Sequence, residues 1–140
     1  MDLEPSILKA VAWLHWKNDQ MLCVRSIGKD KFYIPGGKYE QGESDSEALR
    51  REITEELGVT LIPNSIQELI TIHAPAHGYP APTKVAMKCF QADFEGKLAI
   101  ASEIQELAWL KFEDRDECAP AARLAIEYLR DASYLATETG

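Results

Sequence analysis

The chain contains little cysteine, no excess of basic residues and no long apolar run, and each shortage excludes a class of protein. Its 140 residues include three cysteines, none spaced as C-x-x-C, so neither a zinc motif nor a disulfide framework is indicated. The longest apolar run covers residues 10–14, which is far too short to cross a bilayer. Residues 1–5 are acidic and lack the apolar core of a secretory signal. These features predict a cytoplasmic protein with reduced thiols and no membrane partner.

Acidic charge predominates in a composition that is otherwise ordinary. The chain has 15 Lys and Arg against 23 Asp and Glu, a net charge of −8, and 46% hydrophobic residues. Such a composition is typical of a globular protein, and the length predicts one domain spanning residues 1–140. Clustered basic charge gives nucleic-acid coats their affinity, so we expect no DNA partner. A small phosphate-bearing substrate is compatible with this charge if a cation lies between its phosphates and the protein.

Apolar runs and chain-breaking residues predict several strands and two helices. Strands are expected over residues 7–16, 20–27, 32–34, 66–73, 84–94 and 106–112. We expect the first two to form a hairpin, the third to end at Pro35-Gly36-Gly37, and residues 74–82 to form a loop. Residues 44–47 form a capping box for a helix that ends at Gly58, and Pro120 begins an amphipathic helix. The expected fold class is α/β, with helices packed on a mixed sheet.

Three carboxylates crowd one side of the first predicted helix. At about 100° per residue, its apolar stripe comprises Leu49, Ile53 and Leu57. Glu52, Glu55 and Glu56 fall on the neighbouring arc, where each like-charged pair costs about 0.2–0.5 kcal/mol. The dipole at the helix C-terminus also disfavours negative charge. A bound divalent cation would make this crowding of carboxylates favourable, because Mg²⁺ binds through a few carboxylates together with substrate phosphates. Taken alone, a solvated acidic face is the alternative interpretation.

The spacing around these carboxylates favours the metal-binding interpretation. Five residues separate Gly37 from Glu43, and seven separate Glu43 from Arg51. Residues 52–59 continue as Glu-Ile-Thr-Glu-Glu-Leu-Gly-Val. The segment matches the Nudix box, G-x5-E-x7-R-E-U-x-E-E-x-G-U with U aliphatic, at every specified position. The chain therefore resembles the Nudix (MutT-like) hydrolase family, which implies an α/β/α sandwich with a mixed β-sheet.

The resemblance implies a metal site and a set of residues that orient it. The expected ligands of Mg²⁺, or of Mn²⁺, are Glu52, Glu55, Glu56 and the backbone carbonyl of Gly37. Arg51 is expected to fix the position of a neighbouring carboxylate, as residues behind metal ligands commonly do. Glu43 and Gly58 are two further box residues, and we expect them to orient the motif. A helix-cap or salt-bridge role is the simpler alternative for Glu43.

Residues outside the box supply candidates for proton transfer and substrate binding. Glu52 is the favoured general base, and Glu103, which precedes the strand bearing Trp109, is the second candidate, ahead of Glu106. Arg25 and Lys38 resemble family positions that contact phosphate oxygens. In the proline-rich loop, Tyr79 is expected to stack on a base, with His73 and His77 nearby. For each of these residues an ordinary surface role is the alternative.

The predicted reaction is metal-dependent hydrolysis of a phosphoanhydride bond. The favoured substrate is a normal or oxidised (deoxy)nucleoside triphosphate, giving a nucleoside monophosphate and pyrophosphate. ADP-ribose or a nucleotide sugar is the alternative substrate class, and a decapping or RNA-processing enzyme is a further one that the acidic charge disfavours. A non-catalytic nucleotide-binding module is the alternative of another class, and all box glutamates being present argues against it. The sequence leaves open whether the protein is a monomer or a homodimer.

Overall fold

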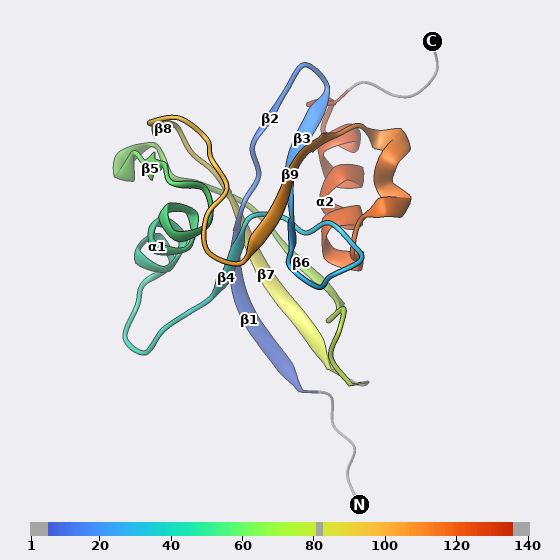
Figure 1. Ribbon diagram of the computed structural model, residues 1–140, viewed down its shortest axis with the longest axis horizontal. Helices are drawn as coiled ribbons and strands as arrows, with labels where there is room; N and C mark the ends of the chain where they lie inside the picture. Colours follow the sequence, from blue (N-terminus) through green and yellow to red (C-terminus); the bar gives the residue numbers. More distant parts are fainter. Residues whose placement is uncertain (1–5, 81–82, 136–140) are drawn as a thin grey trace, which may run out of the picture.

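The strands form a central layer with one helix on each side in the computed structural model, which describes residues 6–80 and 83–135 (Figure 1). In these described residues, two α-helices and two 3₁₀ helices interrupt the strands. In chain order the elements are β1 (Ile7–Trp13), β2 (Trp16–Lys17), β3 (Gln20–Ser26), β4 (Gly36–Lys38), α1 (Asp45–Leu57), β5 (Thr60–Leu61), η1 (Pro63–Ser65), β6 (Gln67–Pro75), β7 (Lys84–Gln91), β8 (Phe94–Glu95), β9 (Ile104–Leu110), η2 (Phe112–Glu117) and α2 (Pro120–Asp131).

Strand β1 is central because both of its faces are apolar. Val11 and Trp13 pack in the cluster beneath α1, whereas Ala12 and Leu14 pack in the cluster beneath α2. The strand pairs with β7 in parallel and with β4 antiparallel, in a four-stranded sheet of order β4-β1-β7-β6. A second sheet has the order β2-β3-β9, and β5 pairs with β8. This mixed arrangement between two helices confirms the expected α/β/α fold.

The expected hairpin between residues 7–16 and 20–27 is wrong. Only β2 pairs with β3 across the turn, through Trp16 opposite Met21 and Lys17 opposite Gln20. Strand β1 ends at Trp13, and β3 instead pairs along its length with β9. Because β1 is apolar on both faces, a position between β4 and β7 covers it more completely than an edge position in a two-stranded hairpin.

The strand expected over residues 32–34 is also displaced. Phe32 and Tyr33 make only isolated bridges, and the regular strand is β4, which contains the two glycines expected to break the chain. Gly36, with φ of 150°, lies so close to β1 that a Cβ would collide with the carbonyl oxygen of Val11. The absence of a side chain therefore lets this segment pair with β1 instead of ending the sheet.

Local sequence signals determine both ends of α1. The Ser44 hydroxyl accepts a hydrogen bond from the Glu47 N–H at 3.2 Å, and the Glu47 carboxylate accepts one from the Ser44 N–H at 2.9 Å. This confirms the predicted capping box. Gly58 ends the helix with φ of 69°, as expected for a C-terminal glycine. Between these ends, the buried positions are Ala48, Leu49, Ile53 and Leu57.

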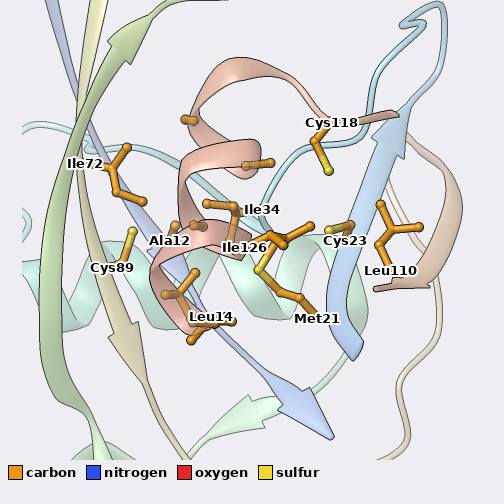
Figure 2. Packing of buried hydrophobic residues seen from close by; sticks show 14 of the residues in the cluster. Ala12, Leu14, Met21, Cys23, Ile34, Ile72, Cys89, Leu110, Cys118 and Ile126 are labelled. Atoms are coloured by element: carbon orange, nitrogen blue, oxygen red, sulfur yellow. The ribbon is translucent and has the colours of Figure 1, made fainter. Parts of the chain in front are cut away.

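The second helix begins at Pro120, as predicted, and covers the opposite face of the strands. Figure 2 shows Ile126 of α2 close to Ile34 and Met21, within a buried cluster that also contains Leu14 and Ile72. All three cysteines are buried and unbridged, and Cys23, Cys89 and Cys118 belong to this same cluster. Within the part of the chain that the structure describes, neither helix has the length and apolarity needed to span a membrane.

Candidate active site

The C-terminal half of α1 packs beside the two glycines of β4. The Gly36 N–H donates a hydrogen bond to the Glu56 carboxylate at 3.2 Å, and Glu56 lines a cleft of about 260 Å³. Burial raises the pKa of Glu56 to about 8, and the Glu52 and Glu55 carboxylates act in the same direction. The hydrogen bond from Gly36 opposes this shift without overcoming it. Without a bound cation, Glu56 therefore keeps its proton to a higher pH than an ordinary glutamate does.

The second carboxylate of the cluster is held against Gly37. A Cβ on Gly37 would collide with the carboxyl group of Glu52, so glycine leaves the space that this carboxylate occupies. Glu52 is mostly buried, and burial raises its pKa while the Arg51 guanidinium lowers it. Glycine at this position thus allows backbone and carboxylate oxygens to approach one another closely.

Arg51 connects the helix to the loop that precedes it. Its Nε and Nη2 donate to the two oxygens of Glu43, at 2.6 and 2.9 Å, and Nη2 also donates to the Lys38 carbonyl at 3.0 Å. Its Nη1 donates to the Glu52 carboxylate at 2.8 Å. The Arg51 guanidinium and the Glu40 N–H together lower the pKa of Glu43 to about 2. This planar fork fixes Glu52 relative to β4, a geometry that a lysine cannot reproduce.

Glu55 is more exposed than its neighbour Glu52 and does not line the cleft. Its side chain is half exposed, and one oxygen lies 3.4 Å from Nη1 of Arg51. Within residues 6–80 and 83–135, no three acidic, histidine or cysteine side chains converge as ligands of one metal ion. The donor set nevertheless fits a hard cation, because Mg²⁺ takes few protein carboxylates and completes its shell with water and substrate phosphates. Glu52 and Glu56 are the two carboxylates best placed to hold it, with Glu55 at their margin.

The cleft beside these carboxylates has an apolar interior and a polar mouth. Leu8, Ala10, Val24, Ile34, Val85 and Met87 line its interior. At the mouth, the Lys38 ammonium lies 5.0 Å from the centre of the Tyr79 ring, a cation–π contact. Lys29 also lines the cleft, and its ammonium lies beside Gly78. An apolar interior with ammonium groups at its mouth suits a planar base attached to a phosphate chain.

Several expected site residues do not line this cleft: Glu43, Arg51, Glu52, Glu55 and Gly58 of the box, and Arg25 and Glu103 outside it. Arg25 donates two hydrogen bonds to Glu106, at 2.7 and 3.2 Å, and this pairing directs its guanidinium along β9. Glu103 is exposed, but its loop is anchored to the helix, because the Ala101 N–H donates to the Glu56 carbonyl at 3.0 Å. The loop therefore holds Glu103 near the C-terminal end of α1. The roles of Arg25 and Glu103 stay predictions.

Sequence reasoning did not name Lys29 or Tyr33 as site residues, although both line the cleft. They lie between β3 and β4, and neither belongs to a recognisable motif. His77 lines the cleft as expected, whereas His73 is an exposed residue of β6 and does not line it. The alternation of buried and exposed positions along a strand could have distinguished His73 from His77 only if the end of β6 had been known.

Comparisons with known proteins agree with this geometry. Residues 7–131 match the family model described as the NUDIX domain. Nucleoside triphosphatase NudI of Salmonella heidelberg (strain SL476) is 32% identical over 101 residues, which cover 68% of this chain and 72% of the relative. The solved E. coli ORF135 protein is 26% identical, with a TM-score of 0.70 over 91% of this chain and 94% of that chain. The MutT protein of Methanosarcina mazei Go1 is 22% identical, with a TM-score of 0.71 over 94% and 99%.

Nudix hydrolases generally use a divalent metal and act on small nucleotide substrates. Three observations agree on the family. The chain contains the complete box, residues of the box line a cleft, and the family model matches most of the chain. The chain therefore belongs to the Nudix family and is an enzyme that acts on pyrophosphate bonds.

Proposed function

We propose that the protein hydrolyses a normal or oxidised (deoxy)nucleoside triphosphate to a nucleoside monophosphate and pyrophosphate. The observation that carries this proposal is that the box borders an apolar cleft. Glu56 and both glycines of β4 line that cleft. A base in the cleft directs the attached phosphates toward Glu52 and Glu56. The curated relative named a nucleoside triphosphatase supports the same substrate class.

The proposed chemistry assigns a separate task to each side chain. Glu52 accepts a proton from the attacking water, whose oxygen bonds to phosphorus as the bridging P–O bond breaks. Arg51 holds Glu52 in position through the 2.8 Å hydrogen bond between them. Lys38 and Lys29 attract the phosphate chain at the mouth of the cleft, and Tyr79 stacks on the base. Glu103 is the second candidate for the proton acceptor.

The proposal includes a divalent cation, Mg²⁺ or Mn²⁺, held by Glu52 and Glu56 with help from Glu55. When bound, such an ion neutralises phosphate charge and lowers the pKa of a water molecule. Without it, the acidic helix would repel the substrate, since the two carboxylates and the phosphates carry charge of the same sign. Binding of the ion would also compensate for the burial that raises the pKa of Glu56.

A substrate panel with Mg²⁺ tests this proposal directly. Nucleoside triphosphates, their oxidised forms, ADP-ribose, nucleotide sugars and dinucleoside polyphosphates are incubated with the protein, and products are identified by mass. We expect monophosphate and pyrophosphate from a triphosphate, and no products in EDTA. Preferential cleavage of ADP-ribose or a nucleotide sugar would replace the proposed substrate class. Binding without turnover across the panel would instead favour a nucleotide-binding module.

The Glu52→Gln variant tests the residue assignments. The amide has the shape of the carboxyl group but accepts no proton, so we expect the fold to persist and turnover to fall by about a hundredfold or more. Glu113→Gln, an exposed position in η2, is the matched control that also removes one negative charge. Near-full activity of the Glu52 variant would make both its base and its ligand roles wrong.

A further inference from the structure

The outer wall of the cleft is a loop that the rest of the protein holds through a few side chains. This loop, residues 76–80, follows β6 and contributes Ala76, His77 and Tyr79 to the cleft lining. Its backbone hydrogen bonds are local: the Tyr79 N–H donates to the Ala76 carbonyl at 3.2 Å, and the Ala76 N–H donates to the Thr83 carbonyl at 3.1 Å. Side-chain contacts therefore decide how closely the loop approaches the opposite wall.

One of these contacts joins two loops that are distant in the sequence. His77 Nε2 lies 3.0 Å from Oδ1 of Asp30, which belongs to the turn after β3. Tyr33 packs against the same histidine, with ring centres 5.9 Å apart, and its hydroxyl lies 3.5 Å from the His77 carbonyl oxygen. Asp30 is highly exposed and does not line the cleft, whereas His77 is mostly covered and does.

We propose that Asp30 is a positioning residue for substrate binding, which acts through His77 to hold the loop of residues 76–80 against the mouth of the cleft. The inference rests on the proposed function, because it assigns the occupant of this cleft as the substrate. Asp30 belongs to no motif and does not itself line the cleft, so it acts through His77 to restrict the position of the wall that carries Tyr79.

The groups around the pair keep the Asp30 carboxylate available as an acceptor. Asp30 faces the imidazole from the turn after β3, flanked by Lys29 and Lys31, while Tyr33 and Tyr79 are the neighbouring phenols. The hydrogen bond with His77 lowers the pKa of Asp30, so this carboxylate stays ionised in mildly acidic solution. Asp30 therefore offers His77 an ionised oxygen 3.0 Å from Nε2.

Hydrogen exchange of the substrate-free protein tests the contact without any enzymatic readout. The amides of Ala76 and Tyr79 are followed in the wild type and in Asp30→Ala, which removes the carboxylate. We expect about two- to fivefold less protection in Asp30→Ala, the range that an exposed pair supplies. Asp131→Ala, which removes a carboxylate paired with Arg130, should leave the protection of both amides unchanged. Equal protection in wild type and Asp30→Ala would overturn the proposal.

Steady-state kinetics with GTP and Mg²⁺ tests the consequence for the substrate. Asp30→Ala should raise KM about two- to fivefold with kcat nearly unchanged, because the loop that carries Tyr79 is then less firmly positioned. Asp30→Glu should restore part of the affinity. A fall in kcat with unchanged KM would contradict positioning by Asp30. If wild type cleaves no triphosphate, the proposed function fails, while the exchange experiment still decides whether Asp30 holds the loop.

Discussion

Replacing Glu56 with glutamine should stabilise the metal-free protein while abolishing its activity. Glu56 is a mostly buried carboxyl group that accepts a hydrogen bond from the Gly36 N–H, and the amide oxygen of glutamine can accept the same bond. Burial raises the pKa of Glu56 from its ordinary value of 4.5 to about 8. In the wild type, ionisation of Glu56 is therefore less favourable in the folded protein than in the unfolded chain, which lowers the free energy of unfolding, and the variant lacks this effect.

The sign of the effect follows from proton linkage. Below pH 4.5 the carboxyl group is protonated in both folded and unfolded chains, so burial costs nothing. Between pH 4.5 and about 8 the unfolded chain loses the proton and the folded protein keeps it, so wild-type stability falls as pH rises. At about 1.4 kcal/mol per pH unit, the gain of the variant reaches at most about 5 kcal/mol near pH 8.

Urea unfolding in EDTA from pH 5 to pH 9 measures this gain. We expect the free energy of unfolding of the variant to exceed that of the wild type by a margin that grows with pH and levels off near pH 8. Adding Mg²⁺ should then stabilise the wild type and leave the variant unchanged, because only the wild type gains from a bound cation. If the free energies of unfolding of the two proteins differ by the same amount at pH 5 and pH 8, Glu56 is not a buried group with a raised pKa.

Three further substitutions test the geometry around this carboxylate. Gly37→Ala should lower kcat about tenfold to a hundredfold with little loss of stability, because the new methyl group displaces the Glu52 carboxyl; unchanged kinetics would contradict this. Arg51→Lys should raise the pKa of Glu43 from about 2 toward its ordinary value in an NMR titration, and a titration that still falls near 2 would show that the guanidinium fork is dispensable. Ile53→Ala removes a fully buried side chain and should cost about 2–5 kcal/mol in urea unfolding, whereas a loss below about 1 kcal/mol would mean that the site beneath α1 collapses freely.

Helix α1 illustrates how much local sequence can predict. The capping box at Ser44, the apolar stripe through Ile53 and the terminal Gly58 each depend on residues within a few positions of one another. The box spacing likewise places Glu52 and Glu56 on one side of a helix whatever the rest of the fold does. These features were predictable because helical hydrogen bonds and helical faces are defined by short separations along the chain.

Strand partners were not predictable in the same way. Residues 7–16 and 20–27 read as a hairpin, yet β1 pairs with β7, which lies far along the chain. An apolar strand shows that it is buried without showing which neighbour covers it. Gly36 was read as a chain break for the same reason, since its role in β4 depends on the approach of β1 from another part of the chain.

The sequence by itself determined helix α1, the side on which its carboxylates lie and the family to which the chain belongs, because these are set by spacing along a single element. Only the tertiary structure decided that Glu56 is buried against Gly36, that Glu55 faces outward, and that Asp30 meets His77 across the mouth of the cleft. Burial and contact between distant loops depend on how strands and helices pack, and that information is distributed over the whole chain.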